Sequence, residues 1–197
     1  MTPTLTPRQQ EILDASLKVI DRDGVKRFTM KNVAQEIGVT DAALYKHFPD
    51  KGAILGALAS LFKASTLDQL EAIRQNSQLD ALGKLQAFIQ GRARQFEENR
   101  ALTVTLFSEE LFRDMASVWS LNNDTMESHA QQLLAIVREG QAAGCLRNDL
   151  PPQHVVMLLT GPIRLLVTGW KTAPESGPPL VQRVDAYWET FAKIVKP

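Results

Sequence analysis

The stretch VTDAALYKHFPDK, residues 39–51, contains side chains that suit contact with a nucleic acid. If Leu44 and Phe48, spaced i and i+4, face a core, their neighbours on the same short helix face outward. Tyrosine and lysine contact phosphate oxygens, while alanines let base edges come close and contact a thymine methyl group. The outward set is Asp41, Ala42, Ala43, Tyr45 and Lys46. The pattern predicts a DNA-reading helix, against the alternatives of a core tyrosine and a solvated cationic surface.

Short helices are expected to position these side chains. Each of the first four helices should start at a capping side chain, in turn Thr6, Thr29, Thr40 and Asp50. Gly24 ends the first, Gly38 breaks the second at a turn that needs positive φ, and Pro49 ends the third. A short helix, a glycine turn and a capped short helix are typical of a helix-turn-helix, whose second helix enters the major groove.

The segment FTMKNVAQEIGVTDAALYKHFPDK (28–51) resembles the DNA-binding signature of the TetR-type (tetracycline-repressor-like) bacterial transcriptional regulators. The shared pattern is a threonine-initiated helix, an Ala…Gly-Val-Thr turn and a Leu-Tyr-x-His-Phe-x-x-Lys ending. Family members often have a glutamate after that lysine, where this chain has Gly52. The resemblance implies a three-helix DNA-binding domain, then a larger helical domain that binds a small molecule and dimerises. Residues 96–119 and 136–170 resemble the regulatory half more loosely.

The resemblance also implies roles for individual residues. Thr29, Tyr45 and Lys51 would contact phosphates, and His47 matches a polar position near them. The residues that would meet bases or the adjacent backbone are Lys31, Asp41, Ala42, Ala43 and Lys46. Thr40, which caps the third helix, completes the predicted contact set. Asp41 can accept a hydrogen bond from a cytosine amino group, or can simply favour the start of its helix.

The remaining sequence predicts longer helices and no strand. Helical periodicity extends over 51–75, 79–98, 100–115, 117–143, 153–171 and 180–195. We therefore expect an all-α chain, with a helix-turn-helix domain at 1–51 and a helical effector-binding and dimerisation domain at 52–197. The last two helices have broad apolar faces that either fold onto their own domain or pair with a second copy. The candidate interface residues are Val156, Leu159, Ile163, Leu166, Trp170, Val184, Trp188 and Phe191.

The middle helices contain residues that could line an effector pocket, although plain core is the commoner role for such a set. They are Phe88, Phe107, Leu111, Phe112, Met115, Trp119 and Met126. They suggest an apolar or aromatic effector. Arg164, on an otherwise apolar helix, would pair with an anionic effector or, as we favour, with Glu109 or Glu110.

Composition excludes several other classes of function. Twenty-two basic and twenty-two acidic residues give no overall positive field, so DNA contact must come from local charge. Three scattered histidines, a single cysteine and the lack of a phosphate-cradling glycine loop predict no metal, no cofactor and no enzyme. The polar N-terminus has no secretory signal, and the apolar stretch 155–170 is too short to span a membrane, which predicts a cytoplasmic protein.

The sequence thus predicts a homodimeric, DNA-binding transcriptional regulator, expected to be a repressor that a small molecule releases from a palindromic operator. The alternative is a DNA-binding protein of the same fold that a protein partner controls. A helical enzyme or scaffold with an incidental helix-turn-helix is a third possibility.

Overall fold

The computed structural model describes residues 5–101, 103, 116–172 and 177–197, with the side chains of 116–126 and 172 left aside. Within this described part the chain is helical and contains no strand, which confirms the all-α expectation. Its contacts form two units. We call Met1–Ser65 with Asn99–Thr125 the head, and Thr66–Glu98 with Met126–Pro197 the bundle. The boundary between them falls within the long helix α4 (Lys51–Gln75).

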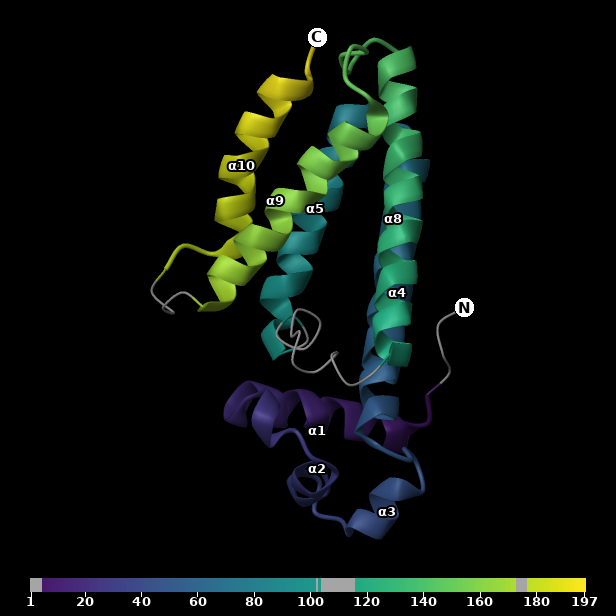
Figure 1. Cartoon of the computed structure of the whole chain (residues 1–197), viewed down its shortest axis with the longest axis vertical. Coiled ribbons are helices and arrows are strands. Elements are labelled where there is room, and N and C mark those ends of the chain that lie inside the picture. The colour runs from purple at the N-terminus through teal and green to yellow at the C-terminus, as the bar shows by residue number, and fades with distance from the viewer. Residues whose placement is uncertain (1–4, 102, 104–115, 173–176) are drawn as a thin grey trace. The chain divides into compact units, whose positions relative to one another are not determined.

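The head begins with α1 (Pro7–Asp23), the short 3-10 helix η1 (Val25–Arg27), α2 (Met30–Glu36) and α3 (Asp41–Tyr45). α1 packs on α2 and α2 on α3 (Figure 1). The predicted caps are all present: the side chains of Thr6, Thr29, Thr40 and Asp50 each accept a backbone N–H three residues on. The apolar faces meet in a small core that includes Ile12, Leu13, Val33, Ala34, Leu44 and Phe48.

Two details of the head differ from the predictions. The sequence did not indicate η1, and α3 ends at Tyr45 instead of continuing to Pro49. The amides of His47 and Phe48 both donate to the Leu44 carbonyl, at 3.0 and 3.1 Å, and close the chain into a turn. That turn keeps Phe48 buried although it lies beyond the helix.

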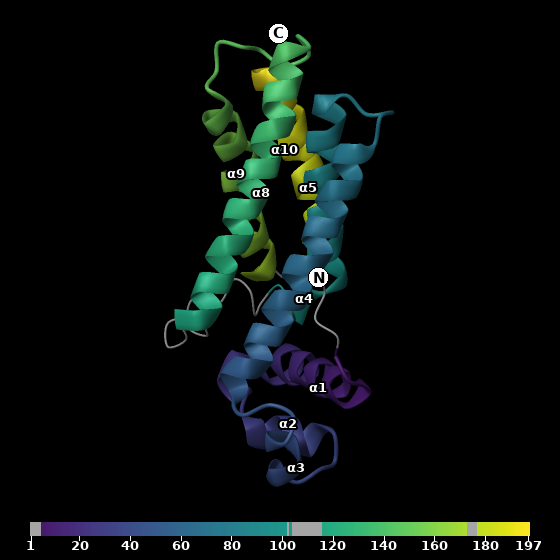
Figure 2. The same ribbon diagram turned by 90° about the vertical axis from the view of Figure 1, so that its right-hand side faces the viewer.

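The bundle contains α5 (Ala81–Glu98), α9 (Pro152–Thr172), α10 (Leu180–Val195) and the part of α8 (Ala116–Ala142) from residue 126 onward. α10 packs on both α5 and α9 (Figures 1 and 2). These bounds agree with the predicted helices to within two residues. The helix predicted over 100–115 lies almost wholly outside the described residues.

Two polar contacts connect α10 to α5. The Val181 amide donates to Glu97 Oε1 at 2.9 Å, and Gln90 Nε2 donates to Asp185 Oδ1 at 2.8 Å. The residue before α10, Pro179, makes no side-chain cap, so Glu97 of α5 satisfies one of the free N–H groups at the start of α10. None of the helices described is both long and apolar enough to cross a membrane.

Candidate nucleic-acid interface

The turn between α2 and α3 fixes the orientation of the predicted reading helix. Gly38 has a φ of 69°, a left-handed conformation that residues with a side chain rarely adopt. The Val39 amide then donates to the Ala34 carbonyl at 2.9 Å, and Gly38 N donates to Gln35 O at 3.2 Å. The chain therefore leaves α2 sharply and enters α3 at Thr40, as a helix-turn-helix requires.

The outer face of α3 is open to solvent. Leu44 is fully buried, whereas Tyr45 is 51% exposed, so Tyr45 is not a core tyrosine. Nine of the ten predicted contact residues are exposed, and Ala43 is half-buried. The exposed ones are Thr29, Lys31, Thr40, Asp41, Ala42, Tyr45, Lys46, His47 and Lys51. A face with small residues, one aromatic hydroxyl and several cations can contact both base edges and phosphates.

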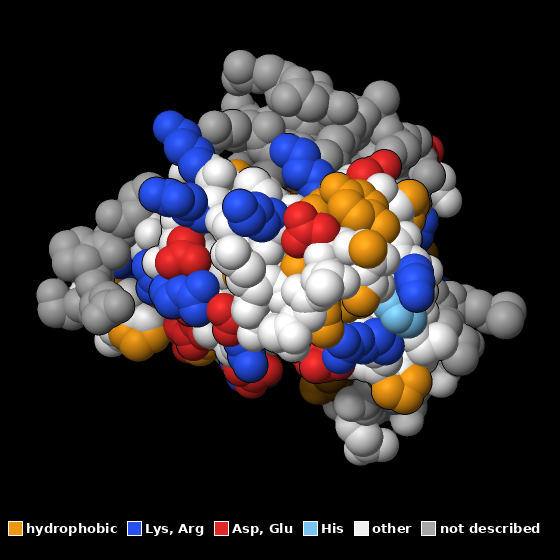
Figure 3. All heavy atoms as spheres, turned by 90° about the horizontal axis from the view of Figure 1, so that it is seen from below, with side chains coloured by type: hydrophobic (Ala, Val, Ile, Leu, Met, Phe, Trp, Pro, Cys, Tyr) orange, Lys and Arg blue, Asp and Glu red, His pale blue; other side chains and the backbone are white. Residues whose placement is uncertain are grey.

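Positive charge is distributed locally on this part of the head. Lys31 lies on α2, Lys46 follows α3, and Lys51 begins α4. Seen from below, Lys and Arg side chains are scattered over the face, with acidic side chains among them and apolar side chains gathered to one side (Figure 3). A neutral chain therefore still presents cations where the reading helix lies, and Asp41 is among the acids beside them.

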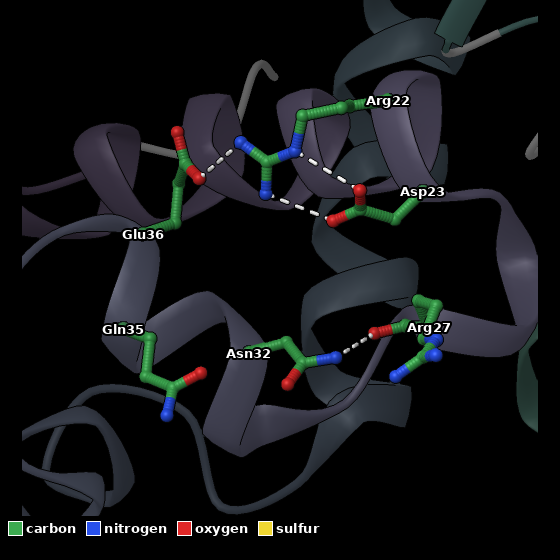
Figure 4. Close-up of a pocket in the computed structure, with 6 residues that line it drawn as sticks. All are labelled: Arg22, Asp23, Arg27, Asn32, Gln35 and Glu36. Atoms are coloured by element: carbon green, nitrogen blue, oxygen red, sulfur yellow. Dashed lines mark hydrogen bonds and ion pairs between the residues drawn. The ribbon is translucent and has the colours of Figure 1, made fainter.

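A polar depression of about 450 Å³ in the head was not predicted. It is lined by Arg22, Asp23, Arg27, Asn32, Gln35 and Glu36 (Figure 4). Arg22 donates to both Asp23 carboxylate oxygens, at 3.0 and 2.8 Å, and to Glu36 Oε2 at 2.8 Å. Because Glu36 is on α2, this exposed arginine links the end of α1 to the end of α2. The hydrogen bond from Arg22 lowers the pKa of Asp23. Helical periodicity relates residues within a few turns of one helix, so it could not predict the contact between Arg22 and Glu36, which are 14 residues apart.

The predicted effector residues fall into three groups. Phe88 is buried in the bundle, as a pocket or a core residue would be. The side chains of Phe107, Leu111, Phe112, Met115, Trp119 and Met126 lie outside the described part. Arg164 is exposed on α9, and its two predicted acidic partners, Glu109 and Glu110, also lie outside it. The predicted pocket and the predicted ion pair therefore stay predictions.

The bundle also buries polar groups that sequence reasoning missed. Arg92 on α5 is 8% exposed, and His129 on α8 is 5% exposed. Arg92 lies four residues from both Phe88 and Phe96, on the same face of α5. The sequence did contain a signal for a buried Arg92, because this charged residue lies between two aromatic residues on the same helix face.

Most of the predicted interface residues build the protomer's own core. Val156, Leu159, Ile163, Val184, Trp188 and Phe191 are buried within the bundle, while Leu166 and Trp170 are half-buried. The rings of Trp188 and Phe191 pack with centroids 5.4 Å apart. The apolar residues that α9 leaves exposed are others: Met157, Leu158 and Leu165. The last two helices were expected either to fold onto their own domain or to pair with a second copy. Folding onto their own domain explains why these six residues are buried.

Comparison with known proteins adds to this geometry. Residues 12–58 match the family model described as bacterial regulatory proteins, tetR family. Nucleoid occlusion factor SlmA of Vibrio cholerae is 25% identical over 198 residues, which cover 96% of each chain. PfmR of Thermus thermophilus, a TetR family transcriptional regulator, has the same fold, with a TM-score of 0.79, 22% identity and coverage of 96% of this chain and 97% of PfmR. The transcriptional regulator FadR of Bacillus subtilis, solved in complex with stearoyl-CoA, gives a TM-score of 0.73 and 22% identity, over 93% of this chain and 97% of FadR.

Proposed function

We propose that the chain is a DNA-binding transcriptional regulator of the tetR family, whose model matches residues 12–58. In this proposal it acts as a homodimeric repressor that a small molecule releases from its operator. In this proposal residues 1–51 form the DNA-binding domain, residues 52–197 bind the effector and dimerise, and the protein works in the cytoplasm. The observation that carries the proposal is the exposed outer face of α3, fixed by its cap and by the glycine turn.

The proposed DNA contacts divide into phosphate and base contacts. Thr29, Tyr45, His47 and Lys51 contact phosphates, which set the position of the protein on the duplex. Lys51 lies at the start of α4, a 25-residue helix whose free N–H groups also favour an anion. Ala42 and Ala43 approach base edges in the major groove, and Asp41 accepts from a cytosine amino group. Lys31 and Lys46 meet bases or the adjacent backbone.

The proposed dimer uses the exposed face of α9. Met157, Leu158 and Leu165 lie on it, and Gly161 between them has open space where a side chain would be. Apolar residues around a glycine allow a second copy of the helix to come close. Two reading helices held about 34–36 Å apart would fit successive major grooves of a palindromic site.

The proposed effector acts through the bundle. The effector must bind the conformation that does not hold DNA more tightly than the conformation that does. The ratio of these two affinities limits how far the effector can release the operator. The stearoyl-CoA bound to FadR, a protein of the same fold, supports a ligand with an apolar body.

The test is binding of the purified protein to the DNA upstream of its own gene. Ala43→Glu should abolish this binding, because it brings a carboxylate to the groove, while the dimer stays folded. Lys51→Ala should weaken binding to every sequence and reduce the slope of log affinity against log salt by about 1 for each lysine–phosphate pair removed. Lys193→Ala, an exposed lysine on α10, is the matched control and should leave the slope unchanged. Wild-type affinity in Ala43→Glu would exclude α3 from the groove.

A second candidate follows from the full-length likeness to SlmA, which is named as a nucleoid occlusion factor. A protein of that kind would act on the nucleoid as a whole more than on one promoter. Chromatin immunoprecipitation distinguishes the two candidates. One or a few operators near regulated genes support the repressor, and many sites spread over the chromosome support the alternative.

A further inference from the structure

Helix α9 contains a proline, Pro162, in its interior. Proline has no backbone N–H, so the carbonyl of Leu158, four residues earlier, cannot receive the hydrogen bond that an α-helix normally provides there. A proline ring also crowds that carbonyl, which kinks a helix at this point. The regular hydrogen bonding of α9 is therefore interrupted at one known oxygen atom.

A side chain of α10 reaches this oxygen. The hydroxyl of Tyr187 donates a hydrogen bond to the Leu158 carbonyl. The Tyr187 ring packs on the ring of Phe191, with centroids 6.3 Å apart, and Phe191 is fully buried in the bundle. Partial burial raises the pKa of Tyr187, so the hydroxyl keeps its proton and remains a donor at neutral pH. An aromatic side chain from another helix thus supplies the donor that the proline lacks.

The interruption divides the exposed apolar face of α9 into two parts. Met157 and Leu158 lie before Pro162 and are 62% and 39% exposed, while Leu165 lies after it and is 75% exposed. The backbone between them is open as well, because a side chain at Gly161 would meet nothing within 4 Å. The alignment of the two parts depends on the direction in which α9 continues beyond the proline. A second copy can contact both parts together only when that direction is fixed.

We propose that Tyr187 is a positioning residue for the dimer, because its hydrogen bond to Leu158 fixes the course of α9 at Pro162 and so aligns the face that meets a second copy. The proposal rests on the proposed function, which places the dimer on this face. A surface that is held in its bound shape before association loses less conformational freedom on binding, so the dimer gains affinity. Helix α10 thereby acts on dimerisation through α9.

The experiment measures the dissociation constant of the full-length dimer by analytical ultracentrifugation. Tyr187→Phe keeps the ring and removes only the hydroxyl. It should raise the constant about 3- to 10-fold, the range that the net contribution of one hydrogen bond allows.

Thr160→Val is the matched control on α9. The Thr160 hydroxyl also donates to a carbonyl of this helix, that of Val156, at 2.9 Å. Residue 160 is not a proline, so its amide can still bond that carbonyl when the hydroxyl is removed. The control variant should therefore leave the dissociation constant within about twofold of the wild type.

Pro162→Ala tests whether the hydroxyl acts through the proline. Alanine restores the amide that can bond the Leu158 carbonyl, so the hydroxyl of Tyr187 is no longer its required donor. Adding Tyr187→Phe to Pro162→Ala should then change the dissociation constant by about twofold or less, and this non-additivity is the quantity measured. If the Pro162→Ala chain does not fold, the comparison of Tyr187→Phe with Thr160→Val decides by itself.

Two results would overturn the proposal. Equal effects of Tyr187→Phe and Thr160→Val, or no effect of either, would show that the hydroxyl does not shape the dimer face. A Tyr187→Phe effect of the same size with and without Pro162→Ala would show that it acts on something other than the proline.

Leu165→Glu tests the proposed dimer face separately. If it separates the dimer while Tyr187→Phe does not weaken it, the face stands and the role of Tyr187 fails. If the Leu165→Glu dimer is stable, the proposed interface fails, and the role of Tyr187 fails with it.

Discussion

The first three helices of the head and the last helix of the bundle begin in different ways. In the head, α1, α2 and α3 each start at a threonine that lies directly before the helix and accepts one of its amides. In the bundle, α5 starts in the same way, because Asp80 accepts the Gly83 amide at 2.7 Å. Helix α10, however, starts at Pro179 without such a side chain and receives Glu97 from another helix. The outer faces differ as well, since α3 exposes polar and small residues while α9 exposes Met157 and Leu165. Local signals therefore set the helix starts of the head, whereas the start of α10 depends on a contact between distant residues.

The strongest test of this difference removes one fully buried side chain from each unit. Leu44→Ala should cost about 2–5 kcal/mol and Phe191→Ala about 3–5 kcal/mol, because each leaves a cavity at a position with 0% exposure. Amide hydrogen exchange should speed up in α1–α3 for the first variant and in α5, α9 and α10 for the second. Faster exchange over the whole chain in either variant would mean that head and bundle unfold as one.

A second variant tests the difference in outer faces. Leu165→Glu should raise the dissociation constant of the dimer by roughly 100-fold or more, because an unpaired carboxylate would be buried between the two copies. Sedimentation velocity measures this, and DNA affinity should fall with it. Gln182→Glu, which adds the same charge to an exposed position of α10, should leave the dimer intact. A stable Leu165→Glu dimer would place the interface on another surface.

The smallest expected effect concerns a single cap. Thr40→Ala removes the hydroxyl that accepts the Ala43 amide at 3.3 Å and should cost about 1 kcal/mol. Thr40→Ser keeps the hydroxyl and should restore most of that stability. Denaturant unfolding gives the size of the change, and hydrogen exchange should confine it to α3 and its turn. Faster exchange in α10 would contradict a purely local role.

The sequence predicted the head well because its signals are local. The caps at Thr29, Thr40 and Asp50 and the positive φ of Gly38 all lie within a few residues of the feature that they control. The end of α3 was less predictable, because two amides compete for the Leu44 carbonyl and either a helix or a turn satisfies them.

The candidate sites in the bundle were harder to predict for a physical reason. Periodicity identifies the apolar residues of α9 and α10, but it does not say which of them the chain itself covers. Val184 and Phe191 are covered by the protomer, whereas Leu165 is 75% exposed. Likewise, the link from Arg22 to Glu36 and the contact between Phe88 and His129 depend on how separate helices meet.

The dependence of α10 on Glu97 has a consequence for how the protein is made. A ribosome releases Glu97 long before Val181, which follows 84 residues later. The caps of α1, α2, α3 and α4 all lie within the first 50 residues, so these helix starts are complete early in synthesis. Helix α10 can join α5 and α9 only after its own residues, Leu180–Val195, have been made. A newly made chain would therefore have the helices of its head before the packing of its bundle was complete.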